Sequence, residues 1–175
     1  MNASTEIPYS SKDLIAALDA MNVAYTLHRH EPVFTVEEGE YLEKTIPGTH
    51  CRNMFLRDKK KNMFLVTLAN ETMVDLKKLP DVLGCGRISF GSADRLWDNL
   101  GIRPGSVNPF CIVNDKDGAV RIILDKYMME QETINVHPMD NAMTIGLAPV
   151  DLVRFIETTN HESEIVDLSG CAPDA

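Results

Sequence analysis

The chain has 175 residues and a formal net charge of −9, from 17 Lys and Arg against 26 Asp and Glu. This length is typical of one domain that buries its own core. The acidic balance argues against a protein that coats duplex nucleic acid, although a local basic site remains compatible with it. No apolar run approaches a membrane span, and the N-terminus lacks the pattern of a secretory signal. We therefore expect a cytoplasmic protein.

Capping residues followed by apolar periodicity predict five helices. They begin after Ser10 or Ser11, at Thr35 (to about residue 44), at Asp75 (to 79), at Ser92 (to 100) and at Pro149 (to 158). The sequence Thr-Val-Glu-Glu at 35–38 fits a capping box, in which Glu38 bonds back to the start of the helix.

Short apolar and β-branched runs between these helices predict strands. They cover residues 23–28, 53–57, 63–68, 87–90, 110–114, 119–124, 133–136, 144–147 and 164–168. Turns at 58–62 and 116–118 join two pairs of these strands into hairpins. This irregular alternation favours an α+β fold with a mostly antiparallel sheet. Residues 1–9 and 169–175 are expected to be flexible tails.

The four cysteines are widely spaced, which favours neither a zinc site nor a disulfide framework. They are Cys51, Cys85, Cys111 and Cys171. Cys51 adjoins Arg52, whose charge could lower the pKa of the thiol. The common nucleotide-binding and hydrolase motifs are absent from the sequence.

Three stretches stand out instead. Residues 51–61 hold five Lys or Arg and one Asp, which fits either an anion contact or an exposed hairpin tip. The small residues from Gly105 to Pro109 form either a loop that offers backbone N–H groups to a ligand or a plain connection. His137 precedes a proline, with Asn141 and Thr144 nearby, and it either orients substrate or water or stabilises a turn.

With these stretches in this order along the sequence, the chain resembles the YbaK/prolyl-tRNA-editing family. Its members are the stand-alone relatives of the editing domain inserted in bacterial prolyl-tRNA synthetase. The likeness is greatest to the trans-editing branch called ProXp-ala or PrdX, and it spans residues 10–168 as one editing domain. It rests on HEPVFTVEE (30–38), RNMFLRDKK (52–60), VDL (74–76), RISFG (87–91), LG and PGSV (100–107), ND (114–115) and HP with Asn141 and Thr144 (137–144).

The resemblance implies a curved mixed sheet surrounded by helices. It also implies hydrolysis, in trans, of the ester that joins a wrong amino acid to tRNA(Pro), which is alanine in the ProXp-ala branch and cysteine in the YbaK branch. An aminoacyl ester is already activated, so positioned water can suffice without a protein nucleophile or a cofactor. The implied partners are the acceptor end of tRNA(Pro) and, among proteins, prolyl-tRNA synthetase or an elongation factor. We expect a monomer or a weak homodimer without a metal.

The resemblance also implies the site residues. The catalytic ones are Arg52, His137 and Gly105. Those that bind substrate are Asn53, Ser106, Val107, Asn108, Pro109, Asn141, Thr144, Phe34 and Thr35. Those that meet the rest of the tRNA are Arg57, Lys59, Lys60 and Lys61.

Two positions depart from the family pattern. Arg52 stands where the family has Lys, and Asn108 stands where Thr or Ser is common. Arg and Lys differ in geometry and reach, so the first exchange keeps open a second function: a tRNA-binding or interaction module that lost the reaction. A deacylase for cysteine or for another small acyl ester is a further alternative. The acidic charge of residues 125–175, set against the basic stretch 51–61, suits a protein that touches only the tip of a tRNA.

Overall fold

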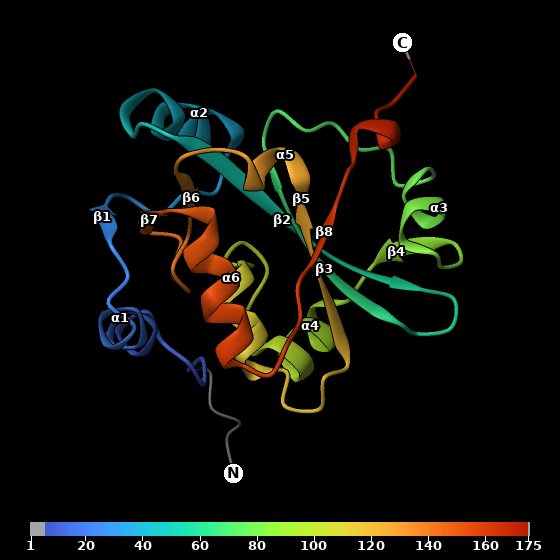
Figure 1. Ribbon diagram of the computed structural model, residues 1–175, viewed down its shortest axis with the longest axis horizontal. Coiled ribbons are helices and arrows are strands. Elements are labelled where there is room, and N and C mark those ends of the chain that lie inside the picture. Colours follow the sequence, from blue (N-terminus) through green and yellow to red (C-terminus); the bar gives the residue numbers. More distant parts are fainter. Residues whose placement is uncertain (1–5, 175) are drawn as a thin grey trace.

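A twisted mixed sheet forms the centre of the protein (Figure 1). The structure, a computed structural model, describes residues 6–174 without the side chain of Val36. The strands are β1 (Tyr25–Arg29), β2 (Thr49–Asp58), β3 (Met63–Ala69), β4 (Ile88–Phe90), β5 (Val120–Asp125), β6 (Ile134–Val136), β7 (Met143–Leu147) and β8 (Glu164–Val166). The helices are α1 (Ser11–Ala20), α2 (Val36–Thr45), α3 (Leu79–Leu83), α4 (Ala93–Leu100), α5 (Lys126–Met129) and α6 (Pro149–Thr158), with 3₁₀ helices η1 (Pro109–Asn114) and η2 (Ser169–Cys171).

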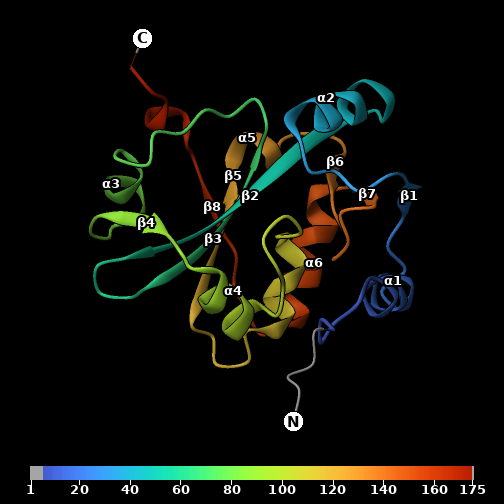
Figure 2. The same cartoon turned by 180° about the vertical axis from the view of Figure 1, so that it is seen from behind.

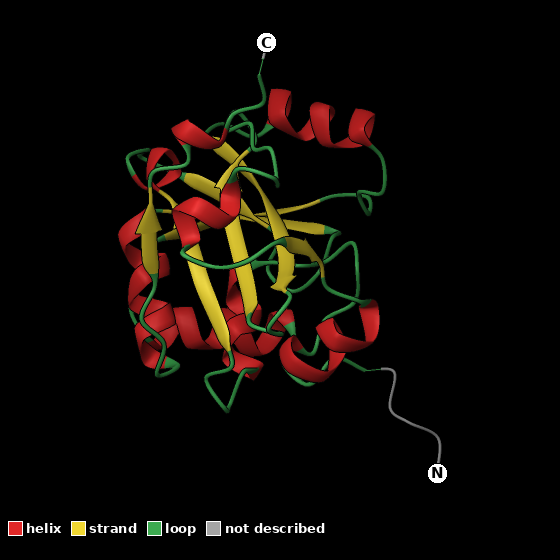
Figure 3. Ribbon diagram, turned by 90° about the vertical axis from the view of Figure 1, so that its right-hand side faces the viewer, coloured by secondary structure: helices red, strands yellow, loops and turns green. Residues whose placement is uncertain are grey.

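The strand order is β1-β7-β6-β2-β3-β5-β8, and β4 pairs with β2 beside this path. The pairs β1·β7, β6·β7, β2·β3 and β2·β4 are antiparallel. The pairs β2·β6, β3·β5 and β5·β8 are parallel. Figure 3 shows the strands in yellow with red helices around them. The expected α+β class with a mixed, mostly antiparallel sheet is confirmed.

The long strand β2 connects the two parts of the sheet. Its first residues, Thr49 and His50, pair with β6, and the stretch from Cys51 to Arg57 pairs with β3. The expected strand at 53–57 is therefore longer than the sequence indicated. Because β2 starts beside β6 and leads into a hairpin tip, this strand carries the beginning of the basic stretch, and Lys59, Lys60 and Lys61 follow in the turn.

Apolar side chains pack on both faces of the sheet. A larger cluster includes Leu65 and Ile122 of the sheet and is covered by α1, α4, α6 and η1, which Figure 2 shows from behind. A smaller cluster includes Phe64 and Leu79 and lies under α3 and the C-terminal segment. Within residues 6–174, no helix is long and apolar enough to cross a membrane.

The helix caps explain where most helices begin. Ser10 and Asp13 form a capping box at α1, and the Ser92 hydroxyl accepts from the Arg95 N–H at α4. The Thr35 hydroxyl accepts from the Glu38 N–H at the start of α2. The Glu38 carboxylate, however, accepts from the N–H of Phe34 rather than from that of Thr35, so the expected reciprocal bond is displaced by one residue.

The second expected hairpin is wrong. Residues 109–114 form η1 instead of a strand, because Pro109 lacks an N–H and the Asn108 side chain caps the turn by accepting from the Phe110 N–H. Strand β5 then pairs with β3 in parallel, as the long connection through α4 and η1 allows.

The helix expected at 75–79 is also wrong. Asp75 forms a turn by accepting from the Lys77 N–H, and α3 begins at Leu79, with Pro80 in its first turn. A proline is tolerated there because first-turn N–H groups have no helical partner.

Parts of the two segments that we expected to be flexible tails pack against the core. Residues 1–5 lie outside the described part of the chain, whereas Ile7 and Tyr9 pack against the larger cluster. After Leu168 the chain forms η2, and the Cys171 side chain is buried in the smaller cluster. The Asp75 N–H donates to the Cys171 carbonyl at 2.7 Å, so this end is joined to the β3–α3 connection.

Candidate functional site

A cavity of about 190 Å³ lies between helix α2 and one face of the sheet. Its lining comes from segments far apart in the sequence: Val33, Gly39, Leu42, Glu43, His50, Cys51, Arg52, Asn70, Asn135, Val136, His137 and Thr144. In Figure 1, α2 crosses above the start of β2, next to β6 and β7. The topology therefore brings the basic stretch and the His137 stretch to one place.

The polar floor follows from strand alternation. On β6, Ile134 and Val136 belong to the larger apolar cluster. Their neighbours Asn135 and His137 therefore point to the opposite face. Asn135 pairs with His50 on one side and with Gly146 on the other, which places the polar side chains of His50 and Asn135 next to each other under α2.

The Nε2 atom of His137 is available as a hydrogen-bond acceptor. Its Nδ1 lies 2.7 Å from the Met143 carbonyl oxygen, and since a carbonyl can only accept, Nδ1 carries the proton. Burial lowers the pKa of His137 from its ordinary value, and the hydrogen bond to Met143 opposes this shift. The neutral ring then leaves Nε2 as a hydrogen-bond acceptor at the cavity, which is the form a water-orienting or proton-accepting group needs.

Thr144 is fixed beside His137. Its hydroxyl lies 2.8 Å from His30 Nε2, and His30 Nδ1 lies 2.8 Å from the Glu31 carbonyl. The rings of His30 and His137 meet edge to face, with centroids 6.1 Å apart. These contacts hold the wall next to the Nε2 atom of His137 in one geometry.

Arg52 is occupied by backbone carbonyls. Its Nη1 donates to the carbonyls of Ala69 at 2.9 Å and Asn70 at 3.2 Å, and its Nη2 donates to the carbonyl of Thr72 at 2.7 Å. Burial lowers the pKa of Arg52, and the nearby Asp125 carboxylate opposes the shift. Arg52 thus holds the segment after β3 rather than pointing all its donors into the cavity.

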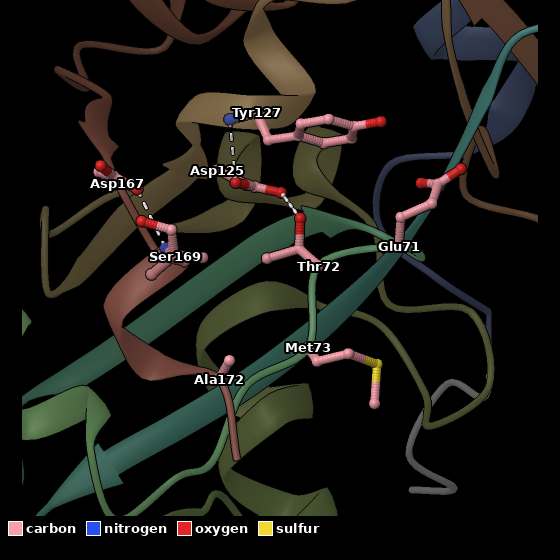
Figure 4. A pocket seen from close by; sticks show the side chains of 9 residues that line it. Glu71, Thr72, Met73, Asp125, Tyr127, Asp167, Ser169 and Ala172 are labelled. Atoms are coloured by element: carbon pink, nitrogen blue, oxygen red, sulfur yellow. Dashed lines mark hydrogen bonds between the residues drawn. The ribbon is translucent and has the colours of Figure 1, made fainter. Parts of the chain in front are cut away.

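Asp125 anchors the same segment from the other side. Its carboxylate accepts from the Ala69 N–H at 3.1 Å, the Thr72 hydroxyl at 2.6 Å and the Tyr127 N–H at 3.1 Å. Figure 4 shows Asp125 between Thr72 and Tyr127 in a second cavity of about 390 Å³. Because these three bonds occupy the Asp125 carboxylate, its oxygens are less available to a ligand in this second cavity.

The Cys51 thiol is not activated. Burial raises its pKa to about 12, so the thiol stays protonated, and the expected lowering by Arg52 is wrong. Within the described residues, no three His, Cys, Asp or Glu side chains form a group that could hold a metal ion.

A wider groove of about 670 Å³ adjoins the small cavity, and Val33 and Leu42 line both. Two aromatic side chains on this groove are strongly exposed: Phe34 at 77% and Tyr41 at 66%. Exposed aromatic rings next to a polar cavity offer a stacking surface for a base or another flat group.

Comparison with known proteins assigns the family. The family model described as "Aminoacyl-tRNA editing domain" matches residues 30–155. The chain belongs to the aminoacyl-tRNA editing domain family. The matched stretch includes both β2 and the His137 segment, so the cavity lies within the editing domain itself.

Several relatives align with most of this chain. The "Prolyl-tRNA editing protein ProX" of Acetoanaerobium sticklandii is 35% identical over 156 residues, which are 89% of this chain and 95% of that protein. The "Prolyl-tRNA synthetase associated domain-containing protein 1" of Mus musculus is 33% identical over 89% of this chain and 94% of its own. A crystal structure described as that of a candidate trans-editing enzyme for prolyl tRNA synthetase aligns with a TM-score of 0.67, at 14% identity, over 95% of this chain and 99% of the other. The last match bears on the fold alone.

The editing domain brings together only some of the residues expected at its site. Arg52, His137 and Thr144 line the small cavity, and Phe34 lines the adjoining groove. The Asn141 side chain donates to the Val33 carbonyl at 3.4 Å and so supports the wall. The remaining residues lie away from the cavity lining.

Asn53 and Thr35 have structural contacts. Asn53 Oδ1 accepts from the Thr67 hydroxyl at 2.6 Å, and Thr35 caps α2. Because Asn53 follows Arg52 on a strand, its side chain points to the opposite face.

The loop at Gly105 contacts the turn after His137 through Asn108 and Met139. Its residues Gly105, Ser106, Val107, Asn108 and Pro109 do not line the small cavity. Asn108 is fully buried, and its Nδ2 donates to the Ser106 carbonyl and contacts Met139 Sδ at 3.3 Å. Val107 packs against the larger apolar cluster, and Pro109 begins η1.

The basic hairpin tip is remote from the cavity. Lys59, Lys60 and Lys61 are exposed beyond the end of β2, whereas Arg57 is half-buried within it. At a rise of about 3.3 Å per residue, the strand separates Lys59 from Arg52 by roughly 20 Å. The tip therefore lies too far away to contact a group bound in the cavity.

Among the lining residues with polar or charged side chains, sequence reasoning did not assign four to the site: Glu43, His50, Asn70 and Asn135. Asn135 alternates with the apolar residues of a short buried strand, and His50 directly precedes the basic stretch, so both carried a weak signal. Glu43 looks like an ordinary solvent-facing helix residue, and only the packing of α2 on the sheet reveals its position.

Proposed function

We propose that this protein is a free-standing deacylase that hydrolyses the ester of mischarged tRNA(Pro), with alanine as the favoured amino acid. One observation carries the proposal: Arg52, His137 and Thr144, from three separate segments, line one small cavity within the editing domain. The name of the relative from Acetoanaerobium sticklandii, a prolyl-tRNA editing protein, supports the choice of tRNA.

The size of the cavity supports a small amino acid. Its volume of about 190 Å³ is below the 300–1,000 Å³ typical of small-molecule sites. The ribose and adenine of the tRNA end would lie in the adjoining groove, where Phe34 and Tyr41 offer stacking surfaces. One methylene contributes only about 1–3 kcal/mol of discrimination in a pocket, so rejection of proline must rest on steric exclusion.

The chemistry needs no protein nucleophile. The unprotonated Nε2 of His137 would accept a hydrogen bond from the attacking water or from the vicinal ribose hydroxyl, and so place it at the ester carbonyl carbon. Arg52 would act as a positioning residue, since it holds the segment from Ala69 to Thr72 that includes the lining residue Asn70. The hairpin lysines would attract the acceptor stem through its phosphates.

The hydrogen bonds of Arg52 favour a second candidate function. Because the donors of Arg52 are directed at three carbonyls, the positive group that the family pattern places next to the substrate is not free. The alternative is a tRNA-binding module that does not turn over its ligand. It predicts tRNA binding that weakens with salt, without deacylation.

The decisive experiment is deacylation of alanyl-, cysteinyl- and prolyl-tRNA(Pro). We expect hydrolysis of the alanyl ester well above the buffer rate and sparing of the prolyl ester. His137→Ala should slow the reaction by about 10²- to 10⁴-fold, the usual contribution of an acid–base group. Binding without hydrolysis of any small aminoacyl ester would favour the alternative, and unchanged rates in His137→Ala would remove this residue from the site.

A further inference from the structure

The small cavity offers more hydrogen-bond acceptors than free donors. His137 Nδ1 is bound to the Met143 carbonyl and His50 Nε2 lies 2.9 Å from the Ile46 carbonyl. A nitrogen bound to a carbonyl carries the proton, so the other nitrogen of a neutral imidazole is an acceptor. The cation of the lining, Arg52, directs its donors at backbone carbonyls. A ligand that brings donors and positive charge is thus better matched than an anion.

Glu43 contributes the only carboxylate of this lining. It projects from α2 across the cavity to the segment after β3, where its Oε1 accepts a hydrogen bond from Asn70 Nδ2. Within residues 6–174, no other hydrogen bond or ion pair involves this carboxylate. One oxygen of Glu43 therefore remains available at the rim.

The floor adds to the negative potential. The Asn135 side chain is 2% exposed, and its Nδ2 donates to the Pro47 carbonyl at 3.0 Å. Its Oδ1 is the one buried side-chain polar atom of the described residues that lacks a hydrogen-bond partner. An unpaired amide oxygen leaves partial negative charge uncompensated under the cavity.

We propose that Glu43 binds the α-ammonium group of the aminoacyl ester, which makes it a specificity-determining residue. The inference rests on the proposed function and deepens it. An ammonium group has three donors and no acceptor, so it complements a carboxylate at the rim and the bare nitrogens of His50 and His137. The substrate class is then an ester with a free amine, which excludes N-acylated and therefore peptidyl esters.

The test compares two nearly isosteric esters, alanyl-tRNA(Pro) and lactyl-tRNA(Pro), in which a hydroxyl replaces the ammonium. Glu43→Gln retains an oxygen that can accept from Asn70 and removes the charge. Because a hydrogen bond to a charged group contributes about tenfold or more, this variant should lower kcat/KM for the alanyl ester about tenfold. Its kcat/KM for the lactyl ester should stay unchanged. Glu40→Gln is the matched control: Glu40 is exposed on the same helix but lines neither the cavity nor the groove, so this variant should alter neither rate.

Equal losses on both esters at an unchanged melting temperature would overturn the inference, as would equal rates of the wild type on the two esters. Binding of a non-hydrolysable mimic, 3′-alanylamino-3′-deoxyadenosine, separates this outcome from failure of the proposed function. If no ester is hydrolysed but the mimic binds more tightly than its lactyl analogue, and Glu43→Gln removes the difference, the ammonium site stands and the deacylase does not. If Glu43→Gln leaves the difference intact, the ammonium site is wrong.

Discussion

Replacement of Arg52 tests how the protein uses the positive charge at the start of β2. The guanidinium donates three hydrogen bonds to the carbonyls of Ala69, Asn70 and Thr72, which no shorter side chain can reach together. Arg52→Ala removes all three bonds. Arg52→Lys keeps the charge, but a compact ammonium cannot reproduce the planar fork, and we expect it to keep one bond.

The magnitude follows from the number of bonds. At a net contribution of about 1 kcal/mol per bond, Arg52→Ala should lower the free energy of unfolding by about 3 kcal/mol and Arg52→Lys by about 2 kcal/mol. For a chain of this size, 1 kcal/mol corresponds to a shift in Tm of about 2–4 °C, so the alanine variant should melt roughly 6–12 °C lower.

Urea unfolding followed by circular dichroism measures this change directly. Arg57→Ala is the control, because Arg57 is half-buried on the same strand and no hydrogen bond from its guanidinium is found within residues 6–174. We expect it to change stability by less than 1 kcal/mol or so. If Arg52→Ala is as mild as this control, the three bonds do not hold the segment after β3. If Arg52→Lys is as stable as the wild type, planar geometry does not matter there.

Three further predictions concern other parts of the molecule. Burial lowers the folded-state pKa of His137, so below about pH 6.5 the unfolded state binds more protons than the folded state. The free energy of unfolding therefore decreases as the pH is lowered. His137→Gln should flatten this fall in acid urea titrations. Gly48→Ala should destabilise the protein by about 1–3 kcal/mol, because φ is +110° and a Cβ would lie 2.7 Å from Asn135 Nδ2. Replacement of Lys59, Lys60 and Lys61 by Ala should weaken tRNA binding and reduce the slope of log affinity against log salt by up to about 3.

For each of these three predictions, one experimental result would contradict it. An unchanged pH profile in His137→Gln would mean that burial does not govern this histidine. A Gly48→Ala protein as stable as the wild type in urea would mean that the chain relaxes around the added methyl group at no cost. Equal salt slopes in filter-binding assays would remove the hairpin tip from the tRNA contact.

The sequence predicted elements well where one local signal dominated. Ser10 and Ser92 are followed by helices because their hydroxyls satisfy otherwise unpaired N–H groups. The prediction failed where a short apolar run was compatible with either a strand or a turn. Residues 110–114 are as apolar as a strand, but Pro109 and the cap at Asn108 favour a 3₁₀ turn, and burial makes the whole turn apolar.

The site was predictable only in part for a related reason. His137 and Arg52 are unusual in their segments, so the sequence points to them. Their meeting depends on the parallel pairing of β2 with β6, which links residues 85 positions apart and leaves no trace in either segment. Glu43 and Asn70 enter the site because α2 packs over that junction, which local patterns do not encode.

In the function proposed above, this cavity hydrolyses the ester of a small amino acid on tRNA(Pro). The most direct measurement is the rate at which the purified protein releases alanine from alanyl-tRNA(Pro), compared with proline from prolyl-tRNA(Pro) under the same conditions. We predict rapid loss of the alanyl ester, no loss of the prolyl ester, and a slow reaction in His137→Ala. An alanyl ester that decays at the buffer rate in the presence of the protein would contradict the claim.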